Sequence, residues 1–360
     1  MRRALAGLVV AAGLTVAAPA YACACGGLVD QPGRATDVTS ETALVVWDGK
    51  TETIVLRLST RTDAVNAGLL VPTPSPATAD LGDEQVFTDL ADVTAPRTES
   101  RWHLFGPPLL GGGGGGDGAS AGGPGGGVEV LASVDLGPLR ATTIAAANTP
   151  ALQSWLTSHD YDASPALLAS VAPYVQEGWT FVAVQLTTAG ESLDGNLPPI
   201  AMRFTSHQAV YPMRMSSAAD DAQQPLVYVL AEHRMLRTDP VASGATRPDI
   251  AFAGPVSVAD VRAPELKRWL ATTPYLTKSS QWLPEPSAIV SDFTYEAAAD
   301  DSPFHQVRYD DTYLLPGDLG ALLVLLLVVG AVWLVVRLLR RPSTAPAESP
   351  SRVRGEPPVG

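Results

Sequence analysis

Lysine is scarce in this chain, whose 360 residues include only Lys50, Lys267 and Lys278. Acidic residues, by contrast, are abundant: residues 23–318 contain 17 Lys and Arg against 35 Asp and Glu, a net charge of −18. Because phosphate groups are bound by clustered basic side chains, this region is not expected to bind nucleic acid or anionic lipid. The low Lys content beside abundant Arg and Ala also indicates a GC-rich, actinobacterial source.

Motifs of common enzymes are absent from the sequence. It has no G-x-S-x-G elbow, no H-E-x-x-H zinc motif and no Cys/His spacing typical of zinc sites. The five histidines are dispersed and no two share a helix face at i, i+4: His103, His159, His207, His233 and His305. The sequence therefore predicts no catalytic residue, no cofactor and no cofactor-binding residue.

A glycine-rich run covers residues 111–127, where 12 of 17 residues are glycine. A phosphate-binding loop requires Lys and Ser or Thr after the last glycine, followed by a helix. Here Val128-Glu129-Val130 follows, which is typical of a strand. We interpret the run as a surface loop and expect no nucleotide binding.

Charge is also missing from two apolar runs. The first follows Arg2 and Arg3 and ends at the small-x-small site Ala20-Tyr21-Ala22, which predicts a secretory signal peptide over residues 1–22. The second, residues 319–336, is about 27 Å long as a helix, close to the thickness of the bilayer core. It predicts a transmembrane helix over residues 314–338.

Arg337, Arg340 and Arg341 follow the second run directly, and basic flanks stay in the cytoplasm. Trp333 near the same end is typical of an aromatic interfacial anchor. We therefore expect a single-pass protein of the cell membrane with residues 23–313 outside. Residues 339–360, rich in Pro and Ser, are expected to form a disordered cytoplasmic tail.

The two cysteines, Cys23 and Cys25, stand at the start of the predicted mature chain with only Ala24 between them. A local disulfide is favoured because the exterior is oxidising. Three alternatives remain open. In the first, Cys23 carries a lipid; in the second, both thiolates hold a soft metal ion such as copper(I); in the third, each cysteine pairs with another chain.

Strand patterns dominate the first third of the exterior region. Residues 42–47 and the alternating Ile54, Leu56 and Leu58 predict two strands joined by a turn at residues 48–50, the second strand being half-buried. The proline-rich segment that begins at Ala67 is expected to leave the sheet, and residues 128–136 predict a further strand.

Helical patterns follow in the middle of the chain. Thr149 as N-cap and Pro150 at the first helical position predict one helix, and Ser164-Pro165 predict a second one ending near Gly178. Strands are expected at residues 180–187, 200–205 and 225–233, with a short helix over 264–270. The predicted class is α+β, a mostly antiparallel β-rich domain with a central helical pair, followed by one C-terminal transmembrane helix.

Two further groups of residues are weak candidates for a site. The acidic pairs Asp220-Asp221, Asp300-Asp301 and Asp310-Asp311 offer oxygen ligands for calcium, although none has the spacing of an EF-hand, and a solvated acidic surface is the simpler interpretation. Trp155, Tyr174 and Trp179 either line a ligand groove or belong to the core, the more common place for such residues.

Several segments resemble the bacterial DUF2330 family of exported proteins: "CACGG", "GLLVPTPSPA", "LQSWLTSHDYD", "PYVQEGWTFVAVQL", "LPPIAMRFTSHQAVYPMRMSS" and "YVLAEHRM". The resemblance extends from about Cys23 to about Asp311. Within this range, the glycine-rich run resembles an insertion relative to the family pattern. The resemblance supports the architecture and implies no catalytic residues.

The sequence favours a membrane-anchored extracytoplasmic module that binds a surface protein or a ligand of the cell envelope, or has a structural role, without catalysis. One alternative is an exported hydrolase with carboxylates that are distant in sequence. Another is a soft-metal-handling protein that uses Cys23 and Cys25.

Overall fold

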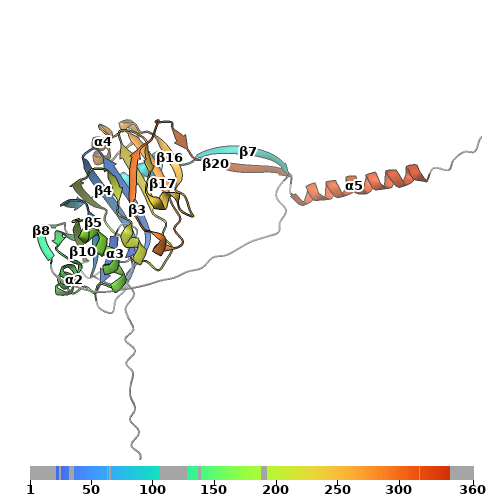
Figure 1. Cartoon of the computed structure of the whole chain (residues 1–360). Coiled ribbons are helices and arrows are strands. Elements are labelled where there is room, and N and C mark those ends of the chain that lie inside the picture. The colour runs from blue at the N-terminus through green and yellow to red at the C-terminus, as the bar shows by residue number, and fades with distance from the viewer. Residues whose placement is uncertain are drawn as a thin grey trace, which may run out of the picture. The chain divides into compact units, whose positions relative to one another are not determined.

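The computed structural model describes residues 22–23, 26–31, 36–62, 64, 66–105, 128–136, 139–187, 193–315 and 317–340. The chain divides into two compact units. The first consists of Met1–Arg97 and Gly115–Val307, and the second of Thr98–Gly114 and Arg308–Gly360. Figure 1 shows the whole chain.

The first unit contains two large sheets. The six-stranded sheet has the order β1-β2-β5-β10-β9-β8, with these bounds: β1 Ala22–Cys23, β2 Gly26–Asp30, β5 Asn66–Thr73, β10 Thr180–Thr187, β9 Leu139–Ala146 and β8 Val128–Asp135. All of its pairings are antiparallel. Because β8 ends the order, it is an edge strand.

The nine-stranded sheet has the order β19-β16-β17-β14-β3-β4-β12-β6, with β11 paired to β4. Its strands are β3 Asp37–Trp47, β4 Thr51–Arg61, β6 Thr78–Leu81, β11 Gly195–Asn196, β12 Ile200–Thr205, β14 Leu226–Ala231, β16 Asp249–Pro255, β17 Tyr275–Ser280 and β19 Phe304–His305. β14 and β3 run parallel, and the other described pairings are antiparallel.

Shorter elements complete this unit. They are the sheet of β13 Ala209–Tyr211, β18 Phe293–Ala297 and β15 Met235–Arg237, the helices α1 Glu84–Val93, α2 Thr149–Ser158, α3 Pro165–Gln176 and α4 Pro264–Leu270, and the 3-10 turns η1 Arg214–Ala218, η2 Pro240–Ser243, η3 Val258–Asp260 and η4 Pro286–Ala288. The predicted α+β class, with antiparallel sheets and a central helical pair, is confirmed.

Central strands of both sheets are apolar on both faces, which produces four layers. In β4, Ile54 and Leu56 face a core between the two sheets, whereas Val55 faces a core shared with α1 and α4. In β10, Val182 faces the core between the sheets and Phe181 faces α2 and α3. Helices therefore cover the outer face of each sheet, and Figure 1 shows α2 and α3 beside β5 and β10. The sequence-based view of β4 as half-buried was wrong, because Val55 is fully buried.

Side-chain caps mark the N-terminal ends of α1, α2 and α3. Ser164 caps α3 as predicted, with its hydroxyl accepting from the Leu167 N–H at 3.2 Å. The cap of α2 lies one residue earlier than predicted, because the Asn148 side chain accepts from the Ala151 N–H at 2.7 Å. The sequence analysis missed α1, although Asp83 caps it by accepting from the Gln85 N–H at 2.9 Å.

The two strands predicted on either side of the turn at residues 48–50 are confirmed as β3 and β4, and they pair with each other. β3 and β4 pair from Asp37↔Arg61 to Trp47↔Glu52, and Gly49 takes φ +90° in the turn between them. The prediction for the proline-rich segment was wrong in part. Pro72 belongs to β5 and pairs with Phe181 of β10, at a level that β2 does not reach.

Residues 22–23 and 26–30 belong to the six-stranded sheet. β1 pairs with β2 through Cys23↔Gly26, and Leu28 of β2 is buried in the core between the sheets. Cys25 and the side chain of Cys23 lie outside the described residues, as do the glycine-rich run and the segments predicted as signal peptide and tail. Their predicted roles, including the disulfide and the metal alternatives, remain predictions.

The second unit contains a two-stranded ribbon and one long helix. β7 (Arg97–Phe105) neighbours β20 (Val307–Leu315), and α5 covers Gly317–Leu339. Residues Leu322–Leu339 of α5 are long and apolar enough to cross a membrane. The helix begins three residues later than predicted, because residues 314 and 315 belong to β20. One apolar helix near the C-terminus is thus compatible with single-pass anchoring.

Candidate ligand pocket

A cavity of about 260 Å³ lies between α2 and the outer face of the six-stranded sheet, and we call it the α2 pocket. Its floor is apolar and consists of Val29, Leu70, Leu156 and Ala183, all buried. Five strands and the end of α2 contribute to the lining. The pocket is therefore formed by the rigid layers of the fold.

Gly68 in β5 makes room for one wall of this pocket. A Cβ atom at this position would lie 2.5 Å from Val29 Cγ2 and 3.3 Å from Tyr161 Cζ. The absence of a side chain lets the Tyr161 ring pack directly over the strand. Tyr161 follows α2 in the chain and lines the pocket.

An aromatic wall is formed by Trp155 and His159, which are one turn apart at the end of α2. Their rings stack with centroids 4.1 Å apart and an interplanar angle of 28°. His159 Nδ1 lies 2.8 Å from the Trp155 carbonyl oxygen and 3.2 Å from the Ser158 hydroxyl. Since Nδ1 is engaged, Nε2 is the ring nitrogen that a ligand can reach.

Polar groups converge on the pocket from both sheet and helix. The Tyr161 hydroxyl donates to Asn66 Oδ1 at 3.0 Å, and burial raises the pKa of Tyr161 to about 12, so the group stays neutral and its oxygen can accept a hydrogen bond from a ligand. Arg140 is exposed at the mouth and lies 3.1 Å from Asp135. Gln185 lies opposite Arg140 in the pairing of β10 with β9. These groups can orient a polar ligand above the apolar floor.

Ser133 and His159 are lining residues of the types that serve as nucleophile and base, and no described hydrogen bond joins them. Among its described lining residues there is no Asp, Glu or Cys. The lining hydroxyl of Ser133 lies 3.3 Å from that of Thr142, and no contact links it to a base. The lining residues can hold and orient a small molecule, as a ligand-binding site does.

The aromatic residues singled out in the sequence are separated by the fold. Trp155 lines the α2 pocket, whereas Tyr174 is fully buried and Trp179 packs against the core of α2 and α3. The Tyr174 hydroxyl donates to Asp292, and the Arg214 guanidinium lies 4.1 Å from the Tyr174 ring centroid. Sequence analysis missed Arg140, His159, Tyr161 and Gln185. The Trp155/His159 spacing on a predicted helix was the available signal.

Two of the histidines contact aspartates of the acidic pairs, which are distant from them in sequence. His103 Nε2 lies 2.8 Å from Asp311 Oδ1, and His233 Nδ1 lies 2.9 Å from Asp301 Oδ2. Asp301 also accepts from the Arg234 N–H at 2.7 Å. Over the described ranges of the chain, no three His, Cys, Asp or Glu side chains are grouped so that they could hold a metal ion.

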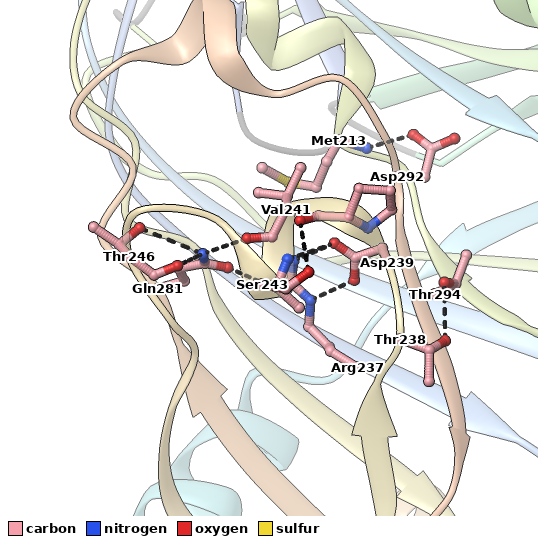
Figure 2. A network of polar contacts seen from close by, with 12 residues as sticks. Met213, Arg237, Thr238, Asp239, Val241, Ser243, Thr246, Gln281, Asp292 and Thr294 are labelled. Carbon is pink, nitrogen blue, oxygen red and sulfur yellow. Dashed lines mark hydrogen bonds and ion pairs between the residues drawn. The ribbon is translucent and has the colours of Figure 1, made fainter.

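A second cavity, of about 180 Å³, lies between η2 and η4 and is lined mainly by apolar side chains such as Val241, Leu283 and Ile289. A buried polar network beside it fixes its walls (Figure 2). Arg237 binds both carboxylate oxygens of Asp239 at 2.8 and 2.6 Å. Gln281 donates to the carbonyls of Val241 at 3.0 Å and Thr246 at 2.8 Å.

The α2 pocket is the better candidate for a functional site. It combines an apolar floor, an aromatic wall and convergent polar groups, which is the usual composition of small-molecule sites. The cavity between η2 and η4 offers apolar contact, but its described lining contains no aromatic side chain.

Comparison with curated proteins finds no match, and comparison with solved structures finds none either. Comparison with protein families does find one, over residues 19–296, and its description is "Uncharacterized protein conserved in bacteria (DUF2330)". This match includes the six-stranded sheet, the nine-stranded sheet except β19, the helices α1 to α4 and every residue of the α2 pocket named above. The chain belongs to the DUF2330 family.

Proposed function

We propose that this protein is an exported, membrane-anchored binding module whose α2 pocket holds a small ligand with an apolar, planar body and an anionic group. The observation that carries the proposal is the convergence of Trp155, His159, Tyr161 and Arg140 over one apolar floor. Ligand sites commonly place a few polar groups around apolar walls in this way.

Each part of the pocket favours one feature of the ligand. The stacked rings of Trp155 and His159 offer a flat surface for a planar group. The guanidinium of Arg140 is a planar donor that matches a carboxylate in two parallel hydrogen bonds. Because Arg140 and Asp135 are both exposed, their ion pair is worth little, and an incoming anion can compete for the guanidinium.

The size of the cavity limits the ligand. At about 260 Å³ it is slightly below the usual range for drug-sized molecules, which starts near 300 Å³. A molecule the size of a substituted benzoate fits this description. The hydrolase alternative receives no support here, since the described lining contains no carboxylate.

Binding is testable on the full-length protein in detergent, with sodium benzoate as the probe in ligand-observed NMR. Ala183→Leu adds a side chain to the pocket floor and is expected to weaken benzoate binding by about tenfold or more, which corresponds to about 1.4 kcal/mol. Ser154→Leu adds the same side chain at an exposed position of α2 and serves as the control for detergent partitioning.

The expected pattern is saturation transfer to benzoate with the wild type and with Ser154→Leu, a smaller signal with Ala183→Leu, and none to benzylamine. Equal signals from all three proteins would mean that benzoate binds elsewhere. Equal transfer to benzylamine would contradict the anionic preference assigned to Arg140.

We also propose the orientation of the anchor: the first unit lies outside the cell and the C-terminus inside. The basic residues after the apolar helix support this, because Arg and Lys are retained on the cytoplasmic side. The Arg337 guanidinium lies 5.1 Å from the Trp333 ring centroid, a pair suited to the membrane–water boundary.

External protease added to intact cells is expected to remove the first unit and to spare an epitope tag placed after Gly360. Lysed cells should lose both, which controls for an intrinsically resistant tag. Protection of the first unit in intact cells, with loss after lysis, would contradict the proposed orientation.

A further inference from the structure

The ribbon of β7 and β20 has two different faces. The Arg101 guanidinium lies 3.1 Å from the Tyr309 ring centroid, and further along both strands the His103 and Tyr313 rings are 5.4 Å apart. The second contact lies closer to the C-terminal end of both strands than the first, so the two strands are parallel. The contacts join odd-numbered residues, which therefore share one face of the ribbon. His103 Nε2 lies 2.8 Å from Asp311 Oδ1 on that face.

The other face becomes apolar toward the end of the ribbon. Trp102, Leu104 and Leu314 are even-numbered and therefore lie on this face, where they are 69%, 58% and 62% exposed. Arg308 and Asp310 occupy the earlier positions of the same face of β20. The charge thus lies at the beginning of the ribbon, and the large apolar side chains lie toward its end.

An isolated two-stranded ribbon is at best marginally stable in water. Large apolar side chains that are exposed side by side add to this problem, since contiguous apolar surface usually marks a contact with a partner or a membrane. The ribbon is therefore expected to gain stability from something that covers Trp102, Leu104 and Leu314.

The chain itself indicates what covers them. Only Pro316 separates the last residue of β20 from Gly317, the first residue of α5. One residue spans at most about 3.6 Å, so Leu314 lies within roughly 11 Å of the start of the helix. Where α5 enters a bilayer, the end of the ribbon must lie at the level of the lipid headgroups, a region in which Trp is enriched.

We infer that the face formed by Trp102, Leu104 and Leu314 inserts into the membrane–water interface of the outer leaflet. The partner is a lipid surface, and the ribbon is an interfacial anchor beside the transmembrane helix. This inference rests on the proposed membrane insertion of α5. The opposite face, with the His103–Asp311 pair, stays in the aqueous headgroup region.

The test uses the full chain reconstituted into phosphatidylcholine vesicles with and without brominated acyl chains, because bromine quenches nearby tryptophan. The protein has seven tryptophans, which are compared by single substitution. Trp102→Ser is expected to remove a quenched component from the emission, as is Trp333→Phe in α5. Trp282→Ser, at a half-exposed site of the first unit, is the matched control and should leave the quenched component unchanged.

A second variant keeps the reporter and changes its surroundings. Leu104→Ser with Leu314→Ser is expected to reduce the quenching of Trp102 while that of Trp333 persists. If only Trp333→Phe alters quenching, the anchor holds and the interfacial ribbon is overturned. If Trp333→Phe also has no effect, the membrane insertion of α5 itself fails.

Discussion

Replacing Asp239 with alanine is expected to lower the free energy of unfolding by about 3–5 kcal/mol, the typical result of leaving a buried charge without its partner. The side chains of Arg237 and Asp239 are 4% and 1% exposed, so neither charge can be solvated by water. Asp239 Oδ1 also accepts from the Ala242 N–H at 3.1 Å, which caps η2. Figure 2 shows this carboxylate beside the Arg237 guanidinium.

Arg237 remains fixed by other groups when Asp239 is removed. Its guanidinium lies 3.2 Å from the Phe293 ring centroid and donates to Gln281 Oε1 at 2.6 Å. It therefore cannot swing into solvent without disrupting the η2 wall. The double variant Arg237→Met with Asp239→Ala removes both charges and is expected to recover more than half of the loss.

Denaturant-induced unfolding of the purified proteins measures these differences. Asp249→Ala changes an exposed aspartate of β16 and serves as the control, with an expected effect within about 0.5 kcal/mol. A loss below 1 kcal/mol for Asp239→Ala, or a double variant as unstable as the single one, would show that this ion pair is not an essential part of the fold.

Glu52→Gln is expected to stabilise the protein increasingly as the pH rises. Glu52 is fully buried in β4. Its Oε2 accepts from the Val210 N–H at 3.0 Å, whereas its Oε1 has no hydrogen-bond partner among the described residues. Burial raises the pKa of Glu52 well above its usual value, because the charged form loses its hydration.

The sign of the effect follows from linkage. A carboxyl group whose pKa is raised by folding binds its proton more tightly in the folded state, so wild-type stability falls as the pH rises above the unfolded pKa of about 4.3. The loss is about 1.4 kcal/mol per pH unit until the pH reaches the folded-state pKa. Glutamine does not ionise and avoids this loss.

Urea unfolding at pH 5 and pH 7 isolates the effect, because any constant cost of the amide cancels between the two conditions. The advantage of Glu52→Gln over the wild type is expected to grow by about 1 kcal/mol or more between these values. Glu296→Gln, at an exposed position of β18, is the control and should show no such growth. A pH-independent difference for Glu52→Gln would mean that Glu52 is not buried as described.

Sequence patterns predicted the individual elements better than their assembly. The turn at Gly49 and the cap at Ser164 depend on neighbouring residues and were found. The parallel pairing of β14 with β3 joins Leu226 to Thr42, residues that no local pattern connects. The alternation of Ile54 and Leu56 identified one buried face of β4, but it could not show that α1 covers Val55 on the other.

The α2 pocket was predicted only through Trp155. Arg140, Gln185 and Gly68 become neighbours solely through the register of three strands, in which Gln185 pairs with both of the others. That register is determined by burial of the sheet rather than by any motif. A site assembled in this way leaves no signature along the chain, which explains why sequence analysis found no convincing functional residues.

Mass spectrometry of the small molecules released from the purified protein tests whether the α2 pocket holds a ligand. Wild type and Ala183→Leu would be purified in parallel from the membranes of the same host and then denatured. At least one anionic, planar compound is expected to be stoichiometric with the wild type and depleted about tenfold or more in the variant. Identical sets of compounds from the two proteins would mean that the α2 pocket holds no such ligand.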